Sequence, residues 1–317
     1  MKEKHLARIF LLEAIREFFK EKGFLDVLTL PAVQNPGMET HIHPFGLWRT
    51  KEKKPGPIYL HTSPEFCMKE LLSIGLENIF TLSYVFRDEP DSPVHRNQFV
   101  MLEWYRKNAN YHQIMKDSEE LFNFCSKHLE TRGIKTSGPT QFKKYTISEI
   151  FKKFLDIDIL NYLQVEPLRD LIKNNFSDVP LPEFHLEWDD LFFLLFLNKI
   201  EPKLVGDDPW LLFEFPHHLC AYSTLKKEDP RVSERFEIYW KGLELANCFN
   251  ELTDPVEQKN RLEKQAKLKE DLYHYHLPYP LKFMEVMNEG IPKSAGIALG
   301  VERLLSALTG ITDPFWD

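Results

Sequence analysis

Two apolar segments joined by a short polar loop constrain the fold of this chain more than any other feature. Residues Ile79–Phe86 and Gln98–Arg106 are rich in β-branched and aromatic side chains, and the loop Asp88–Arg96 between them is polar. Strands joined by so short a loop must run antiparallel, because a parallel pair needs a crossover of about a dozen residues or more. The sequence therefore predicts a sheet that is at least partly antiparallel.

The order of the remaining elements indicates the fold class. The pattern predicts helices at 3–22, 64–73, 111–129, 146–155, 166–175, 187–199 and 255–275, strands at 24–30, 58–60, 211–215 and 236–251, and a strand then a helix around 296–308. The run Pro55-Gly56-Pro57 predicts a turn. A doubly wound sheet needs regular β–α alternation, which is absent here. We therefore expect an α+β fold, an antiparallel sheet flanked by helices.

Charge and cysteine usage exclude several classes of protein. The 317 residues carry a net charge of −8, which argues against a broad basic surface for nucleic acid. The four cysteines are far apart and indicate reduced thiols, as in a cytoplasmic protein. The longest apolar run, Leu191–Leu197, is far shorter than the ~20 residues that cross a bilayer, so no membrane association is expected.

The predicted hairpin carries the first group of candidate site residues. Arg87 and Glu89 lie two apart at the end of a strand and should share one face; a guanidinium can hold a phosphate, and a carboxylate can accept from an amino group such as that of adenine. Phe99, Glu103 and Tyr105 share parity on the return strand. An isolated Arg-x-Glu would indicate only a solvated face, but the five together favour a binding site.

A second hairpin is predicted around Lys241-Gly242. A two-residue turn there places Glu237 opposite Ala246 and makes Glu237 and Glu244 diagonal neighbours, about 7–8 Å apart. Two carboxylates at that spacing can both ligate Mg²⁺ together with phosphate oxygens. A surface hairpin with solvated acids remains an equal alternative on spacing alone.

Strict alternation places the rest of this hairpin's polar residues on the other face. Asn247, Phe249 and Glu251 can line one pocket with Glu237 and Glu244 if a β-bulge near Ala246–Asn247 reverses the parity.

The third group lies near the C-terminus. Gly296 and Gly300, four apart in a predicted strand, would allow a ligand or another backbone to approach closely. Arg303 follows at the junction with the apolar helix Leu304–Leu308, where a planar cation can stack on a base and contact phosphate. Packing between backbones is the alternative explanation for the two glycines.

Taken together and in this order, these segments resemble the catalytic core of the class II aminoacyl-tRNA synthetases. Phe86-Arg87-Asp88-Glu89 with Phe99 resembles the second motif of that class, and Gly296–Arg303 resembles the third. The helix and strand ending at Pro31 resemble the first motif, which forms the dimer interface in that class. The resemblance covers residues 1 to about 308.

Three further segments, His61–Glu65, Met101–Tyr105 and Gly242–Asp254, are similar to the lysyl-tRNA synthetase branch. Within it, the chain resembles a short paralogue group that lacks the OB-fold, the elongation factor P–lysine ligases. The resemblance implies an ATP- and Mg²⁺-dependent ligase that activates lysine, preferentially (R)-β-lysine, as an adenylate and transfers it to a lysine of elongation factor P. It also implies a homodimer, one catalytic domain over 1–317 with an insertion at 130–210, and no stable tRNA binding.

The resemblance assigns a role to each candidate residue. Arg87 and Arg303 would be catalytic, and Glu237 and Glu244 would hold Mg²⁺. ATP would be bound by Arg87, Asp88, Glu89, His95, Phe99, Glu244, Leu245, Gly300 and Arg303. The amino acid would be bound by Ser63, Pro64, Glu65, Glu103, Tyr105, Asn247, Phe249, Glu251 and Ala298. Three carboxylates suit a diamino acid, because they discriminate a dication from neutral amino acids.

Two departures from the family pattern leave questions open. The family has His-Asn-Pro-Glu-Phe where this chain has His95-Arg96-Asn97-Gln98-Phe99, so the asparagine contact to ATP falls on Arg96 or shifts to Asn97. Ala298 replaces the glycine of lysyl-tRNA synthetases, as it does in the paralogue group, and its methyl would reshape the pocket floor. A synthetase-like enzyme with another acceptor and a non-catalytic regulator remain alternatives.

Overall fold

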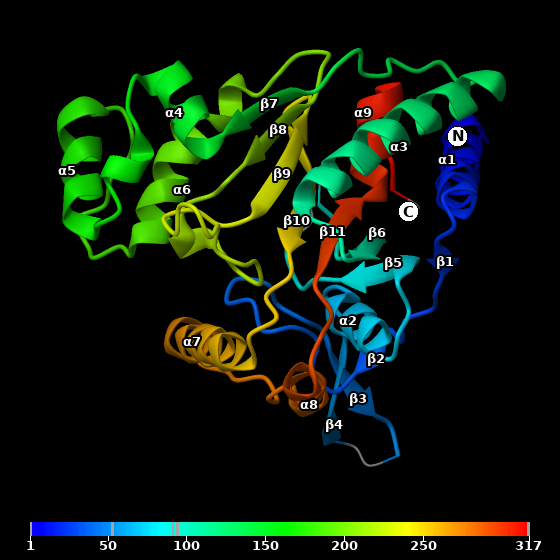
Figure 1. Cartoon of the computed structure of the whole chain (residues 1–317), viewed down its shortest axis with the longest axis horizontal. Coiled ribbons are helices and arrows are strands. Elements are labelled where there is room, and N and C mark those ends of the chain that lie inside the picture. The colour runs from blue at the N-terminus through cyan, green and yellow to red at the C-terminus, as the bar shows by residue number, and fades with distance from the viewer. Residues whose placement is uncertain (1, 52–53, 91, 93–94, 316–317) are drawn as a thin grey trace. The chain divides into compact units, whose positions relative to one another are not determined.

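The computed structural model describes residues 2–51, 54–90, 92 and 95–315, and the chain divides into two compact units (Figure 1). The first unit comprises residues 1–138 and 251–317, and the second comprises residues 139–250. The second unit contains most of the segment predicted as an insertion, 130–210, and extends 40 residues beyond its end. The single domain expected from the sequence stays a prediction.

The first unit contains the predicted hairpin. Its elements are α1 (Lys2–Glu21), β1 (Leu25–Asp26), β2 (Ala32–Val33), β3 (Gly46–Arg49), β4 (Lys54–Leu60), α2 (Glu65–Ser73), β5 (Asn78–Phe86), β6 (Gln98–Lys107), α3 (Tyr111–Thr131), α7 (Pro255–Tyr273), α8 (Leu281–Glu289), β11 (Ser294–Gly300) and α9 (Val301–Thr309). β5 and β6 pair antiparallel, β6 pairs antiparallel with β11, and β1 runs parallel to β5. The hairpin prediction is therefore confirmed. β2, β4 and β3 form a small separate sheet.

Apolar stripes on two helices determine how this sheet is covered. The buried face of α1 includes Phe19, which stacks on Phe80 of β5 with ring centroids 4.8 Å apart and lies 5.3 Å from the ring of Trp104 in β6. On the opposite face, Ile79 and Tyr105 pack against Met68 of α2. Polar side chains of β6 that point the same way as Tyr105 therefore lie on the α2 side, away from α1.

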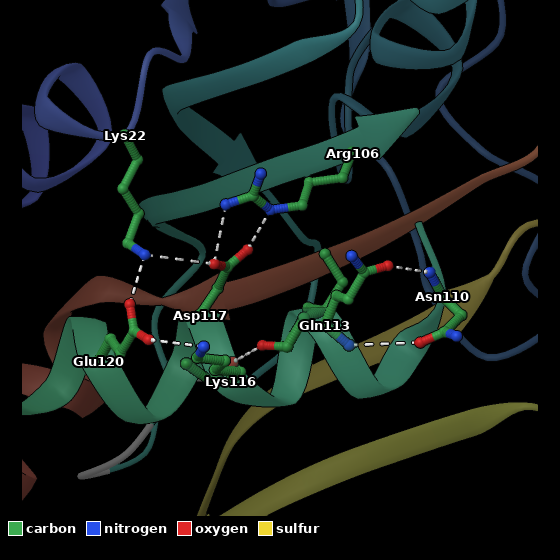
Figure 2. Close-up of polar contacts among 9 residues, drawn as sticks. Lys22, Arg106, Asn110, Gln113, Lys116, Asp117 and Glu120 are labelled. Atoms are coloured by element: carbon green, nitrogen blue, oxygen red, sulfur yellow. Dashed lines mark hydrogen bonds and ion pairs between the residues drawn. The ribbon is translucent and has the colours of Figure 1, made fainter. Parts of the chain in front are cut away.

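An ion-pair network around the buried carboxylate of Asp117 in α3 connects the residue after α1 with β6 (Figure 2). Arg106 donates two hydrogen bonds to Asp117, at 2.5 and 2.9 Å, and its guanidinium lies 4.5 Å from the ring centroid of Phe24. Lys22 lies 3.8 Å from Asp117 and also pairs with the more exposed Glu120. Because the Asp117 side chain is only 5% exposed, its charge depends on these partners.

We expect Asp117→Asn to destabilise the protein by about 2–3 kcal/mol, because it leaves a partly buried guanidinium without its bidentate partner. The matched control Glu120→Gln should cost less than about 1 kcal/mol, since this carboxylate is 40% exposed. Urea unfolding measures both. Equal effects of the two substitutions would contradict the assignment of the network to Asp117.

The second unit contains β7 (Lys143–Thr146), α4 (Ile147–Leu155), a 3₁₀ turn (Ile159–Asn161), α5 (Val165–Asn175), α6 (Trp188–Lys199), a 3₁₀ turn (Glu201–Lys203), β8 (Trp210–Phe213), a 3₁₀ turn (His217–Leu219), β9 (Arg235–Trp240) and β10 (Leu243–Asn250). β10, β9 and β8 pair antiparallel in that order, and β7 runs parallel to β8. Phe151, Phe192 and Phe196 are buried in its core with Trp210 and Tyr239. The apolar run Leu191–Leu197 is thus part of a core helix.

The α+β prediction is confirmed, and the seven predicted helices are present within a few residues. One strand prediction and one turn prediction are wrong. The strand predicted at 24–30 is reduced to the two residues of β1. Pro55-Gly56-Pro57, predicted as a turn, lies within β4, where Pro55 faces Trp48 beside a register shift in β3. Prolines are tolerated there because an irregular ladder requires fewer backbone donors.

Candidate active site

Arg87 and Glu89 lie beyond the end of β5, so the strand parity predicted for them is wrong. The Arg87 amide donates to Asn97 O at 2.9 Å, and the Glu89 amide donates to Arg87 O at 2.9 Å. A tight turn, rather than a strand, therefore orients both side chains. The Arg87 guanidinium carbon lies 5.3 Å from the ring centroid of Phe99, the second residue of β6.

His95 and Arg303 belong to the same cluster. Burial lowers the pKa of His95, the positive charge of Arg303 lowers it further, and Glu89 opposes them. Arg303 lies in the first turn of α9, directly after Gly300, which pairs with Met101 of β6. The turn after β5, the start of β6 and the start of α9 thus bring two cations, a carboxylate and an imidazole together, and their binding of phosphate and base stays a prediction.

A cavity of about 730 Å³ opens beside this turn. Its lining residues are His43, Pro44, Tyr59, Asp88, Glu89, Pro90, Asn97 and Tyr275. Asn97 faces this cavity, whereas Arg96 donates to His95 O at 3.1 Å and lies 4.7 Å from the ring centroid of Phe315. The two candidates for the asparagine contact therefore differ in position, and Asn97 is the one beside Asp88 and Glu89.

A second cluster combines the start of α2 with the segment after β10. Ser63 and Pro64 precede α2, and Glu65 is its first residue. The buried ammonium group of Lys69, one turn later, lies 2.5 Å from Glu65 Oε1 and 2.7 Å from Glu251 Oε2. Glu251 Oε1 accepts no hydrogen bond from the described residues.

Cross-strand pairing between β6 and β11 adds the remaining residues of this cluster. Glu103 lies directly opposite Ala298, and Tyr105 lies opposite Gly296. The Tyr105 hydroxyl donates to Glu103 Oε2 at 3.3 Å. A Cβ on Gly296 would lie 2.1 Å from Tyr105 Cε1 and 2.7 Å from Glu251 Oε1, so this glycine allows the aromatic ring and the carboxylate to approach the strand. Gly300 has no such close contact.

Burial strongly perturbs the acids of this cluster. It raises the pKa of Glu103 well above the ordinary value, with the charge of Glu65 adding to the effect. It also raises the pKa of Glu251 to about 7, although Lys69 opposes the shift. Such acids, held in a small volume, bind a cation strongly because its charge replaces missing solvation.

The hairpin β9–β10 of the second unit contains the predicted turn and the predicted bulge. Lys241 and Gly242 have φ of 51° and 78°, which suits a two-residue hairpin turn. A register shift between Glu244 and Ala246 leaves Leu245 as the extra residue. The bulge lies one residue earlier than predicted, and Asn247 rather than Ala246 therefore faces Glu237.

The bulge places the polar residues of this hairpin on one face. Glu244 pairs with Tyr239, Asn247 with Glu237, and Phe249 with Arg235. Arg235 donates to Asn247 Oδ1 at 3.1 Å and also pairs with Glu237. Glu251 lies in the first unit, beyond the end of β10.

The two carboxylates predicted to hold Mg²⁺ fit a divalent cation. Glu237 is 3% exposed and accepts from Arg235 and from the Tyr239 hydroxyl, the latter at 2.6 Å. A carboxylate has about four acceptor positions, so both oxygens can also ligate a metal. Burial raises the pKa of Tyr239, and the negative charges of Glu237 and Glu244 raise it further. Both carboxylates therefore act on the same hydroxyl group. Among the described residues, no three His, Cys, Asp or Glu side chains form a metal cluster.

Comparison with known proteins identifies the family of this arrangement. Residues 1–313 match the family model for class II tRNA synthetases (D, K and N). The chain belongs to this family. Among its curated relatives are proteins named elongation factor P–(R)-β-lysine ligase. The relative from Histophilus somni (strain 2336) is 34% identical over 96% of this chain and 90% of its own length. Those from Haemophilus influenzae and Vibrio vulnificus are 32% and 33% identical over 96% of this chain and 90% and 91% of their own lengths.

Membership of the class II family agrees with the antiparallel hairpin β5–β6 and with the strand-to-helix junction at Gly300–Arg303. In the part of the chain that the structure describes, no helix is long and apolar enough to span a bilayer.

Sequence reasoning missed two charged residues near the site. Lys69 follows Glu65 by four residues on a helix, and this spacing could have suggested an ion pair.

No local sequence pattern identifies Glu39 as a residue near the site. Burial raises the pKa of Glu39, Glu65 raises it further, and Arg87 and Lys269 oppose the shift. Burial lowers the pKa of Lys269 to about 8, opposed by Glu39. The positive charges that act on Glu39 are thus those of Arg87 and, to a smaller extent, Lys269.

Proposed function

We propose that this chain is an ATP-dependent ligase that activates lysine, preferentially (R)-β-lysine, and transfers it to a lysine side chain of elongation factor P. The observation that carries the proposal is the cluster of carboxylates Glu65, Glu103 and Glu251, of which Glu103 and Glu251 are buried and Glu251 Oε1 accepts no hydrogen bond from the described residues. A diamino acid supplies the ammonium donors that such a cluster needs. The names of the curated relatives support the same substrate and acceptor.

The reaction follows from charge placement. The lysine carboxylate attacks the α-phosphorus of ATP, a P–O bond forms, and the bond to pyrophosphate breaks. Arg87 and Arg303 stabilise the negative charge that develops on the phosphoryl oxygens, so catalysis depends on positioning and electrostatics. The acceptor amine then attacks the carbonyl carbon of the adenylate and AMP leaves with the bonding electrons. No side-chain nucleophile takes part.

The first cluster provides the nucleotide contacts in this proposal. Glu89 accepts from the adenine amino group, Phe99 and Arg303 enclose the base, and His95 approaches the outer phosphates. Since Asn97 lines the cavity beside Asp88 and Glu89, we assign the asparagine contact to Asn97.

The second cluster provides the amino-acid contacts. Glu65, Glu103 and Glu251 receive the two ammonium groups, and Tyr105 orients Glu103 through its hydroxyl. Ala298, directly beside Glu103, shapes the floor of the pocket. Asn247 and Phe249, on β10 of the second unit, stay predicted substrate contacts. Because the acceptor is a translation factor, we place the reaction in the cytoplasm.

The decisive experiment measures ATP–pyrophosphate exchange with lysine, (R)-β-lysine, arginine, glutamine and leucine, followed by transfer to elongation factor P or to tRNA(Lys). We expect exchange with the two diamino acids and transfer to the protein. Absence of exchange with every diamino acid would overturn the activity. Charging of tRNA(Lys) at a rate comparable to protein modification would overturn the acceptor.

We expect Glu244→Gln to raise the Mg²⁺ concentration required for half-maximal exchange by about tenfold, because one of two ligating carboxylates is lost. Glu237→Gln should act in the same direction. Glu201→Gln is the matched control, since Glu201 also contributes to the pKa of Tyr239 but is not a proposed ligand. A Mg²⁺ titration of exchange activity measures all three. An unchanged titration for both hairpin variants would remove them as ligands.

We propose a homodimer that uses the segment between β1 and β2. Leu28 is 93% exposed and Leu30 is 72% exposed, and such apolar side chains next to each other mark an interface. Leu28→Asp combined with Leu30→Asp should weaken the dimer at least about 100-fold. Ile74→Asp, at a comparably exposed site, is the control. Sedimentation equilibrium distinguishes the outcomes, and a dimer unaffected by the double substitution would refute the proposed surface.

A further inference from the structure

We propose that Lys69 is a positioning residue of the amino-acid pocket, which holds Glu65 and Glu251 in place and removes one negative charge, so that the pocket matches a substrate with two ammonium groups. This inference rests on the proposed function, because it concerns the site at which the diamino acid would bind.

Lys69 forms a buried ion-pair site with two carboxylates, not a surface ion pair. The residue is 1% exposed, and its ammonium group bridges the first turn of α2 to the segment after β10. The ring of Phe283 from α8 lies 5.9 Å from Lys69 Nζ and stacks on Phe66 of α2 at 4.2 Å. This aromatic pair helps to shield the ammonium from water, so its charge acts at full strength on the two carboxylates.

The bridge also fixes the orientation of Glu251. Lys69 contacts Oε2, and Oε1 lies on the side of Gly296, where it accepts no hydrogen bond from the described residues. A buried carboxylate oxygen in this state is costly unless a ligand supplies a donor. Without Lys69, the Glu251 carboxylate would have no fixed rotation, and its orientation toward the pocket would be lost.

A charge count relates Lys69 to the class of substrate. The carboxylates of Glu65, Glu103 and Glu251 carry three negative charges when ionised, and Lys69 neutralises one of them, which leaves two. Two ammonium groups of a diamino acid balance that charge, and the carboxylate of the amino acid falls to Arg87.

Titration of the cluster gives the proposal a measurable signature. The charged groups that interact with Lys69 are Glu65 on its own helix, Glu251 after β10 and Glu103 on β6, and Tyr105 of β6 lies close to the same three acids. Burial alone would lower the pKa of Lys69, but Glu251 and Glu65 raise it above the ordinary value. The ammonium in turn lowers the pKa of Glu251, which is about 7. Ammonium binding favours the ionised acids, so substrate affinity falls as the pH drops and Glu251 and Glu103 become protonated.

The test compares wild type with Lys69→Met, which keeps the length of the side chain and removes its charge. We expect KM for lysine to rise at least about 30-fold, as for the loss of a buried charge partner, while KM for ATP stays within about twofold. The pH at which KM for lysine rises should move upward, because Glu251 loses the cation that favours its ionised form. A merely structural role would change stability but not this pH dependence.

A charge-retaining variant keeps the test decisive if Lys69→Met folds poorly. Lys69→Arg keeps a positive charge beside Glu65 and Glu251, and we expect its KM for lysine to lie at least about tenfold below that of Lys69→Met, with a pH dependence close to that of wild type. A wild-type KM and pH profile in Lys69→Met, or a Lys69→Arg variant no better than Lys69→Met, would overturn the role of Lys69. Absence of exchange in the wild type would instead overturn the proposed function, so the two failures are distinguishable.

Discussion

Arg87→Ala is expected to lower ATP–pyrophosphate exchange by about 10³-fold, the loss that follows removal of a preorganised charge from a developing oxyanion. Arg87 is the residue whose backbone joins the turn after β5 to the segment before β6, and its guanidinium lies over Phe99. The substitution removes the planar cation without altering either strand. We expect the loss mainly in the maximal rate of exchange, because the negative charge on the phosphoryl oxygens is greatest in the transition state.

Two variants separate this catalytic effect from general ones. Arg87→Lys keeps the charge but loses the bidentate geometry, so it should recover about tenfold of the lost rate. Arg132→Ala removes a half-exposed guanidinium that pairs with Glu13 at 3.5 Å, and it should leave exchange within about twofold of wild type. Thermal unfolding of all three confirms that the fold is retained. Exchange by Arg87→Ala within tenfold of wild type would rule out the assigned role.

Gly296→Ala is expected to lower kcat/KM for lysine at least about 100-fold, as for a displacement of about 1 Å at a reacting site. The added methyl would lie 2.1 Å from the ring of Tyr105 and 2.7 Å from Glu251 Oε1, so the side chains must move. Tyr105 is 3% exposed and has little room, and the strain should also cost about 1–3 kcal/mol of stability. KM for ATP should stay close to wild type, because the nucleotide residues lie in another cluster.

The matched control is Gly46→Ala in β3. This glycine is also in a strand, but a Cβ there would meet Tyr59 at 3.8 Å, an ordinary contact. It should keep lysine kcat/KM and stability near wild-type values, as judged by exchange kinetics and urea unfolding. If Gly296→Ala behaved like Gly46→Ala, the close packing of Tyr105 and Glu251 against β11 would not matter for substrate binding.

Local sequence patterns predicted those parts of the fold that depend on local interactions. The hairpin β5–β6 followed from two strand-like segments and a short loop, and the turn at Lys241-Gly242 followed from residues that adopt positive φ. The bulge in β10 was predicted as a condition for bringing Asn247 and Glu237 to one face, and it was misplaced by one residue. The alternation of residues along a strand predicts which face of the sheet each side chain lies on. It does not predict the position at which the register between two strands shifts.

Other features depended on contacts that a local pattern does not contain. The predicted strand and β5 both end at Phe86, but strand parity was extended to Arg87 and Glu89 because no local pattern shows the turn closed by the Glu89 amide and Arg87 O. Lys69 was overlooked because one of its partners, Glu251, lies far along the chain. The Pro55–Pro57 run was read as a turn because β3, which pairs with it, has a weak strand pattern of its own. The resemblance to class II synthetases assigned residue roles that geometry alone would have left open.

The extra residue Leu245 has a consequence for how this family can change. Residues after it, including Asn247 and Phe249, lie on the face of Glu237 because one position in β10 has no partner in β9. Replacing Leu245 with another apolar side chain preserves that arrangement, whereas deleting it would turn every later side chain of the strand to the opposite face. The strand therefore tolerates changes of composition far better than changes of length, and an alignment gap placed here would mark a protein with a different hairpin surface.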